Sequence, residues 1–277
     1  MRTVHNLSEN FSDGLLFPKG TSAERGNPEA GYFRYNTETK GIEVYDGTSW
    51  SSMDNTPSYV TDGLVLNLDA GNLNSYGGSG ATWSDLAQDG NDGTINGATY
   101  TSNGYFTFDG SNNYIDLGNV LDFTTSDFSL AAWVNFNSVS DYQVVLQKGR
   151  VGEGTNTGYR IRLENNGQVN FVTNGINDNE VDIQSTTSLS THTWYYITVS
   201  RSGSNHKLYL NAVLEASTSS GDASSLGNNL DLVIGYNKYY PIWGLNGNLS
   251  IVNVYNKALS SDEVTQNFNA NKTRFGL

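Results

Sequence analysis

The sequence contains no cysteine and only four prolines. The missing cysteines exclude disulfides, thiolate zinc sites and cysteine nucleophiles. Basic residues are scarce, with 15 Lys+Arg against 28 Asp+Glu and a net charge of −13, so the clustered cations that bind nucleic-acid phosphates are lacking. No stretch approaches the roughly 18 apolar residues of a membrane-spanning helix, and the first residues lack the apolar run of a secretory signal. We therefore expect no nucleic-acid partner and no membrane insertion.

Aromatic residues are what the sequence has in quantity. Apolar residues make up only 36% of the 277, but 17 Tyr, 11 Phe and 5 Trp can bury large areas in thin sheets. Short runs of alternating apolar residues recur between Gly, Asn and Asp clusters, without a helical pattern between them, and predict an antiparallel all-β sandwich or barrel. These runs are 105–109, 114–117, 128–136, 142–148, 159–164, 168–173, 194–200, 207–214, 230–234 and 249–255.

Residues 1–55 differ from the remainder and are interpreted as an N-terminal attachment arm with a small β-hairpin. Its strands are predicted at Tyr32–Asn36 and Ile42–Asp46. A lone hairpin is marginal in water, and this one carries four large aromatic residues that need a covering surface. We expect assembly contacts to the following domain, a symmetry mate or another protein through Phe33, Tyr35, Tyr45 and Trp50. Residues 56–62 are interpreted as a linker, and 63–277 as the main domain.

One short helix is predicted near the C-terminus, within SSDEVTQNFNANKTRF. Ser260 is placed as its N-cap, with Glu263 three residues later completing a capping box. Val264 and Phe268 lie four residues apart and share one face, which should dock on the sandwich.

Four segments resemble the laminin-G-like, concanavalin-type jelly roll: FDGSNNYIDLG, FSLAAWVNF, HTWYYITVSRSGSNHKLYLNAVLE and LVIGYNKYYPIWGLNGNLSIVNVYNKALSSDEV. The resemblance runs from about Gly63 to the C-terminus. It implies an antiparallel concanavalin A-like jelly-roll sandwich, a fold that serves lectins, hydrolases and inert assembly modules.

The beginning of the chain resembles a different group. GLLFPKGTSAERGNPEAGYFRYNTETKGIEVYDGTSW is similar to segments of tailed-bacteriophage virion proteins, and GLVLNLDAGNLNSYGGSGATWSDLAQDGNDGTI to the opening of phage laminin-G-like domains. This resemblance implies a virion surface protein made in the bacterial host cytoplasm. Its implied partners are major capsid or tail proteins and copies of itself.

The segment EVDIQS is the candidate for a glycoside-hydrolase motif. Some concanavalin-type glycoside hydrolases carry ExDxxE, which supplies the two carboxylates that retaining hydrolysis requires. Glu180 and Asp182 alternate onto one strand face, but the third position is Ser185, so the proton donor is missing. We expect no enzymatic activity.

Calcium is a possible ligand, because laminin-G-like sandwiches often bind a hard cation with turn carboxylates. The candidate ligand is Asp109 in the FDG turn, whereas the Asp that often assists in the family is Ser250 here. Turn Asp residues more commonly stabilise the backbone, and we expect no required cofactor.

Aromatic residues in the segment GYNKYYPIWG suggest a contact surface. Tyr236, Tyr239, Tyr240 and Trp243 cannot all point inward from so short a loop. They either bind glycans, contact a partner protein or close one end of the sandwich.

These patterns together predict a non-enzymatic virion protein that decorates or cements the capsid, with an outward-facing lectin-like domain. Capsid decoration is favoured over a tail fibre because no coiled coil or repeat shaft is present. The alternative is a tail-fibre or receptor-binding adhesin that binds host-surface glycans, and a carbohydrate-binding module without any structural role is the competing class.

Overall fold

A computed structural model describes residues 17–38, 41–52, 58–87, 89–151, 157–176, 180–219, 221, 223–238 and 243–277. The chain divides into two compact units, Met1–Thr56 and Pro57–Leu277. Within the described residues, no helix has the length and apolar character needed to cross a membrane.

The N-terminal unit is a small four-stranded sheet rather than a two-stranded hairpin. Its strands, in sheet order, are β1 (Lys19–Gly20), β2 (Tyr32–Asn36), β3 (Gly41–Tyr45) and β4 (Trp50–Ser52), with a short 3₁₀ helix, η1 (Ser22–Glu24). β1 pairs parallel to β2, and the other two pairings are antiparallel. The predicted strands β2 and β3 are present, whereas β1 and β4 are too short and polar to show an alternating pattern.

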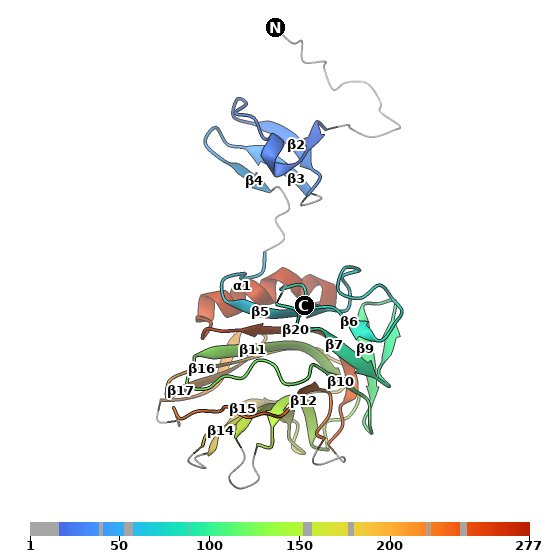
Figure 1. The fold of residues 1–277 in the computed structure, drawn as a ribbon, viewed down its shortest axis with the longest axis vertical. Coiled ribbons are helices and arrows are strands. Elements are labelled where there is room, and N and C mark those ends of the chain that lie inside the picture. The colour runs from blue at the N-terminus through green and yellow to red at the C-terminus, as the bar shows by residue number, and fades with distance from the viewer. Residues whose placement is uncertain are drawn as a thin grey trace. The chain divides into compact units, whose positions relative to one another are not determined.

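The C-terminal unit is an antiparallel sandwich of two sheets, as the sequence predicted (Figure 1). The first, here the front sheet, has the order β15 (Glu180–Ser188), β14 (Gln168–Asn174), β13 (Gly158–Leu163), β12 (Gln143–Gly149), β19 (Leu232–Ile234), β10 (Tyr114–Asp116), β7 (Gly93–Asn96) and β6 (Thr82–Trp83). The second, the back sheet, has the order β18 (Val213–Thr218), β17 (Asn205–Leu210), β16 (Trp194–Ser202), β11 (Phe128–Phe136), β20 (Asn246–Tyr255), β9 (Tyr105–Asp109) and β8 (Thr99–Thr101), with β5 (Leu64–Asp69) also paired to β20.

The main core lies between these sheets and is built from alternate side chains of both. Phe106, Phe128, Ile115, Leu146 and Leu249 are among its members, each with at most 1% of its surface exposed. Since successive strand residues point to opposite faces, their neighbours are directed away from the core. This alternation fixes which residues the front sheet presents on its outer face.

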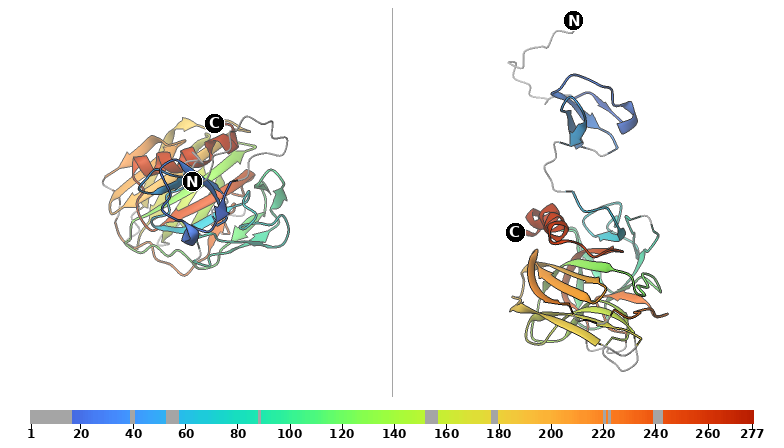
Figure 2. Two further views of the ribbon diagram at one scale, coloured as in Figure 1. Left: turned by 90° about the horizontal axis from the view of Figure 1, so that it is seen from above. Right: turned by 90° about the vertical axis from the view of Figure 1, so that its left-hand side faces the viewer.

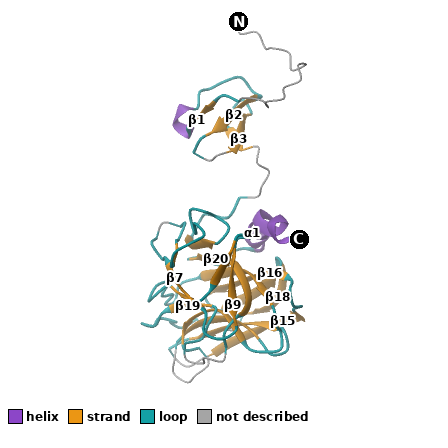
Figure 3. Ribbon diagram, turned by 90° about the vertical axis from the view of Figure 1, so that its right-hand side faces the viewer, coloured by secondary structure: helices purple, strands orange, loops and turns teal. Residues whose placement is uncertain are grey.

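A second core lies on the outer face of the back sheet, beneath α1 (Ser261–Asn271) and the 3₁₀ turn η2 (Lys272–Phe275) (Figure 2). Trp133 is fully buried there, with its ring centroid 4.2 Å from Phe275 and 5.7 Å from Phe268. The Ser260–Glu263 capping box is confirmed, because each side chain accepts a hydrogen bond from the backbone of the other. Figure 3 shows that strands make up most of the regular secondary structure of this unit.

Two boundaries differ from the sequence interpretation. Within the predicted linker, Val60 is buried against the helix and its N–H donates to Asn267 Oδ1 at 2.8 Å, so this part of 56–62 is docked on the sandwich. The run 207–214 is two strands, because Asn211 and Ala212 have φ of 48° and 66° and form a tight hairpin turn.

Candidate functional site

An open groove lies on the outer face of the front sheet, across β7, β10 and β19. Tyr114 and Asp116 flank the core residue Ile115 and therefore project outward, beside their cross-strand partners Asn96 and Thr94. The groove has a volume of about 420 Å³. Its lining residues are Asp92, Thr94, Asn96, Tyr114, Asp116, Leu117, Gly118 and Asp231.

Strand register extends this surface into a transverse row. Arg160 on β13, Gln147 on β12, Val233 on β19, Asp116 on β10 and Thr94 on β7 are successive cross-strand partners. Four of these five side chains are polar. This row of the front sheet therefore carries hydrogen-bonding side chains from four of five neighbouring strands.

Lys238 sets the charge at one wall of the groove. Its Nζ lies 2.7 Å from Asp116 Oδ2 and 2.7 Å from Asp231 Oδ2, and 5.7 Å from the centroid of the Tyr114 ring. Burial by itself would lower the pKa of Lys238, but the hydrogen bonds to the two carboxylates outweigh it and raise that pKa. Lys238 therefore stays cationic and joins the ends of β10 and β19.

Tyr236 enters the site because the chain turns sharply after β19. Gly235 has a φ of 81° and lies so close to Phe108 that a side chain there would collide with the ring. The Tyr236 ring then stacks on Tyr114 with centroids 5.7 Å apart and planes at 21°. This stack forms an aromatic platform beside the groove.

A small cavity adjoins the groove and shares Asp231 with it. Its lining residues are Gln147, Gly149, Asp231, Val233, Tyr236 and Lys238. Gln147 is 4% exposed, and its Nε2 donates to Gly149 O at 2.7 Å. Within the described part of the chain its Oε1 has no hydrogen-bond partner, so a residue that lines this cavity keeps a buried acceptor without a donor.

The predicted aromatic patch is brought together only in part. Tyr236 reaches the groove, whereas half-buried Trp243 packs farther along the same sheet, 5.5 Å from the Tyr142 ring. The Arg160 and Arg162 guanidinium groups lie 5.3 and 4.7 Å from the Trp243 ring centroid. Tyr239 and Tyr240 lie outside the described residues.

The hydrolase-like segment lies at the edge of the front sheet, on β15. Glu180 and Asp182 are exposed on its outer face, and Asn170 Nδ2 donates to Asp182. Ser185 is 2% exposed, and its Oγ accepts from Val169 N at 2.9 Å and donates to Thr187 O at 2.8 Å. Position 185 therefore faces inward, opposite to the two carboxylates.

Asp109 ends β9 and is exposed. Its Oδ1 accepts a hydrogen bond from Ser111 N at 2.9 Å, which is the local turn geometry of an Asp side chain. In the part of the chain that the structure describes, no group of three or more His, Asp or Glu residues is arranged to hold a metal ion. Calcium at Asp109 stays a prediction.

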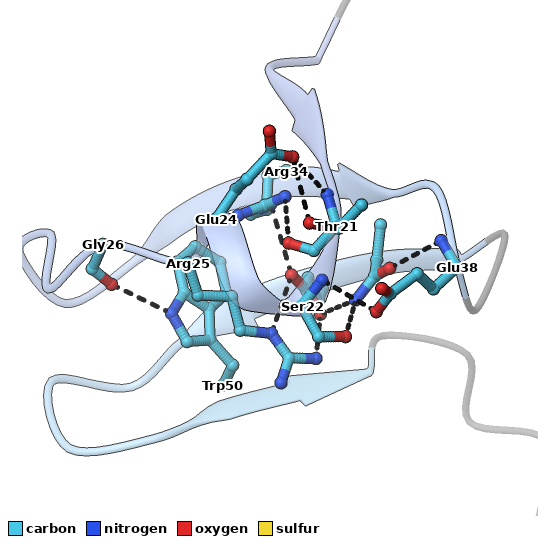
Figure 4. A network of polar contacts seen from close by, with 10 residues as sticks. Thr21, Ser22, Glu24, Arg25, Gly26, Arg34, Glu38 and Trp50 are labelled. Carbon is cyan, nitrogen blue, oxygen red and sulfur yellow. Dashed lines mark hydrogen bonds and ion pairs between the residues drawn. The ribbon is translucent and has the colours of Figure 1, made fainter.

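The N-terminal unit buries charge on one face of its sheet (Figure 4). Glu43 is 3% exposed and lies in an ion pair with Arg25, Nη2 to Oε2 at 2.6 Å, and with Arg34, Nε to Oε1 at 3.3 Å. Asn36 is fully buried and donates to Glu43 Oε2 at 3.0 Å. η1 supplies Ser22 to the same network, since Asn36 Nδ2 donates to Ser22 Oγ.

The opposite face of that sheet carries the apolar side chains. Phe33 and Tyr35 are 41% and 36% exposed, and their cross-strand partners Val44 and Ile42 are half-buried. These four residues are called the apolar face below.

Of the four predicted assembly residues, Tyr45 is covered within its own unit. It is 8% exposed, with its ring centroid 5.3 Å from that of Trp50. The unpredicted strand β4 places Trp50 directly beside it, and both belong to the charged face. Phe33 and Tyr35 remain available.

A cleft of about 570 Å³ also exists in this unit, between Tyr32, Trp50 and the segment around Pro28. Its strongest polar groups are already engaged. Arg34 donates to Thr21 O, and Trp50 Nε1 donates to Gly26 O. We therefore place the candidate site in the groove of the front sheet.

Most groove residues were not identified from the sequence. Asp92, Asp116 and Asp231 are spread over some 140 positions and form no linear motif. The only sequence signal is the alternation Tyr114-Ile115-Asp116, which puts the side chains of Tyr114 and Asp116 on one face of the strand.

Comparisons with known proteins agree on the fold. A family model described as the concanavalin A-like lectin/glucanases superfamily matches residues 109–265. No curated protein matches the chain in sequence.

Among solved structures, the binding domain of Paraclostridial Mosquitocidal Protein 1 is similar with a TM-score of 0.61 at 17% identity, over 76% of this chain and 52% of that one. The botulinum neurotoxin serotype D ligand-binding domain in complex with N-acetylneuraminic acid is similar with a TM-score of 0.55 at 16% identity, over 76% and 51%. Trypanosoma rangeli sialidase in complex with sialic acid gives 0.58 at 17% identity, over 76% and 33%. The chain spans about half or less of the length of these structures.

Proposed function

The chain belongs to the concanavalin A-like lectin/glucanases superfamily, and from that premise we propose that it is a non-enzymatic surface protein whose sandwich binds carbohydrate through the front-sheet groove. The observation that carries the proposal is the groove itself, where carboxylates and an aromatic stack meet in about 420 Å³. A sugar offers hydroxyl groups and an apolar C–H face. Asp116 and Asp231 can accept from hydroxyls, while the Tyr114–Tyr236 stack can cover the C–H face.

The likeness to glycan-associated structures supports the same proposal at the level of fold. Two of the similar structures are complexes, one with N-acetylneuraminic acid and one with sialic acid. They concern those proteins, but they demonstrate that similar folds occur in proteins that contact sugars.

The proposal of a binding rather than a hydrolytic role rests on β15. Retaining hydrolysis needs two carboxyl groups on one cleft wall, and the third position of the motif is an inward-facing serine. We expect no release of reducing sugar from a polysaccharide panel. Reproducible release that disappears in Glu180→Gln would contradict this expectation.

A glycan panel with the full chain tests the binding proposal. Tyr114→Ala removes the platform and should weaken binding roughly fivefold to tenfold, the range for one aromatic contact. Tyr32→Ala, an exposed tyrosine of the N-terminal unit, is the matched control and should leave affinity unchanged. Absence of binding to any glycan, or equal loss in both variants, would contradict a site in the groove.

A second role is proposed for the N-terminal unit, namely attachment to a virion, through capsid or tail proteins or copies of itself. The specific observation that favours it is the apolar face of Phe33, Tyr35, Ile42 and Val44. The resemblance of this segment to phage virion proteins supplies the candidate partner. On a lattice, many weak contacts of this kind become collectively strong.

Labelled antibody imaging of purified particles tests the attachment role. The protein should be found on capsids or tails, and the double change Phe33→Ser with Tyr35→Ser should remove it. Thr48→Ala, which changes an exposed turn residue, serves as the control. Particles that lack the protein, or that retain the double variant in full, would contradict attachment through the apolar face.

A further inference from the structure

The groove carries an excess of negative charge. Three carboxylates line it, from Asp92, Asp116 and Asp231, and among the residues that the structure describes no Arg, Lys or His lines it. The adjoining cation is Lys238, which is bound at 2.7 Å to two of these carboxylates. The groove and its immediate wall therefore hold three negative charges against one positive charge.

Acceptors outnumber donors among the side chains that line the groove, where three carboxylates accompany the hydroxyls of Thr94 and Tyr114 and the amide of Asn96. Asn96 Nδ2 donates to Thr94 O at 3.0 Å, and Lys238 directs two of its three N–H bonds to Asp116 and Asp231. Each carboxylate oxygen can accept more than one bond. The site therefore has more capacity left for ligand donors than for ligand acceptors.

Gln147 supplies an independent indication of the same preference. Its side chain lies in the cavity next to the groove, is 96% buried, and keeps Oε1 without a donor. Its amide nitrogen donates to Gly149 O, so its oxygen is the end that lacks a donor among the described residues. A buried acceptor without a donor costs free energy, and the cavity of about 10 Å³ has room for one water that could bridge Oε1 to a hydroxyl or ammonium group of a ligand.

We propose that the groove selects glycans that present donors, namely uncharged hydroxyls and the ammonium groups of unacetylated amino sugars, and rejects glycans that bear carboxylate or sulfate. The inference rests on the proposed carbohydrate-binding function and specifies its ligand class. A carboxylate placed here would meet three like charges that Lys238 offsets only in part, and it would leave Gln147 Oε1 unpaired. An ammonium group would meet the net negative charge that remains.

The net charge of −13 could repel anions without any site, so the test must separate the groove from the whole molecule. Asp116→Asn removes one groove charge while keeping the side-chain shape. Asp262→Asn, on the helix that covers the back sheet, removes the same charge elsewhere and is the matched control.

The experiment measures binding of full-length protein to two matched pairs of sugars at mildly acidic pH. One pair is a glucosamine oligomer and the fully N-acetylated oligomer of equal length, and the other is lactose and sialyllactose. The glucosamine oligomer should bind at least roughly fivefold tighter than its acetylated form, and lactose tighter than sialyllactose, since a close charge pair near a surface is worth about that much or more. Added salt should shrink both differences.

The variants give the deciding comparison. Asp116→Asn should reduce the preference for the amine, and Asp262→Asn should leave it unchanged. Equal or tighter binding of sialyllactose, or equal effects of the two variants, would overturn the inference while leaving carbohydrate binding intact. Failure of all four sugars and of a broader panel would overturn the proposed function and the inference with it.

Discussion

The two units of this protein distribute polar and apolar side chains in opposite ways. The sandwich buries its apolar residues between two sheets, and its front sheet presents a polar groove outward. The N-terminal sheet buries Arg34, Asn36 and Glu43 at 6%, 0% and 3% exposure and leaves Phe33 and Tyr35 exposed.

The difference follows from what covers each sheet. The front and back sheets cover each other, so apolar side chains have an apolar partner along their full length. The small sheet is covered on one side by η1 and Arg25, which provide hydrogen bonds and charge but little apolar surface. A buried charge is tolerated there because Glu43 is paired with two arginines and an amide.

The largest expected effect comes from the sandwich, in Trp133→Ala. Trp133 is fully buried and stacks on Phe268 and Phe275, so its removal should lower the free energy of unfolding by about 4 kcal/mol. Trp50→Ala makes the same substitution in the other unit and should leave the sandwich transition in place. Differential scanning calorimetry of the full chain measures both, and a shift below about 1 kcal/mol for Trp133→Ala would argue against the second core.

In the N-terminal unit the largest effect should come from a charge. Glu43→Ala leaves Arg25, Arg34 and Asn36 without their shared acceptor, at a cost of about 3 kcal/mol. Glu29→Ala, an exposed acid of the same unit, should cost almost nothing. Amide hydrogen exchange over β2 and β3 reports the result. Equal protection in both variants would mean that the buried network does not hold this sheet together.

Lowering the pH should weaken the same Glu43 network, by less than the Glu43→Ala substitution does. The hydrogen bond from Arg25 lowers the pKa of Glu43, and the one from Asn36 adds to this effect. Burial alone would raise that pKa, but the hydrogen bonds outweigh it and keep the pKa below its ordinary value. A carboxyl with a lowered pKa in the folded state stabilises fully above its unfolded pKa and loses that contribution as pH falls through the folded one. Once the intrinsic pH dependence of exchange is divided out, the protection factors of the β2 and β3 amides should therefore fall as pH drops below about 4. The Glu43→Gln variant should lose this dependence, and an unchanged profile in that variant would assign the acid response to other groups.

The smallest effect should come from the apolar face. Tyr35→Ser should change the free energy of unfolding by less than about 0.5 kcal/mol, because that side chain is already exposed and its loss opens no cavity. Tyr45→Ser, on the covered face, is the paired comparison and should cost clearly more. A similar loss of unfolding free energy in Tyr35→Ser and Tyr45→Ser would show that the two faces of the sheet are not distinct.

Local patterns were predictable from the sequence, and long-range neighbours were not. The capping box at Ser260 and Glu263 was found because its residues are three positions apart. The strand β4 was missed because WSS is short and polar, and with it the covering of Tyr45 by Trp50. The groove was missed because β10 and β19 are more than one hundred residues apart, and register rather than motif brings Asp116 beside Val233.

The aromatic loop illustrates the same limit. Its four rings were read as one patch, yet Tyr236 stacks on Tyr114 while Trp243 packs on the arginines of β13. The sequence indicated only that four rings in so short a loop cannot all point inward. Which ring reaches which strand depends on the turn at Gly235, which only the packing of Phe108 reveals.

The central claim is that the polar outer face of the front sheet, and not the N-terminal unit, contacts carbohydrate. Titration of the isotope-labelled full chain with a neutral oligosaccharide that it binds, followed by NMR chemical-shift mapping, tests this most directly. Shifts should be confined to residues 92–96, 114–118 and 231–238 and to the Gln147 side-chain amide. Shifts confined to residues 17–52, or to the helix side of the back sheet, would contradict it.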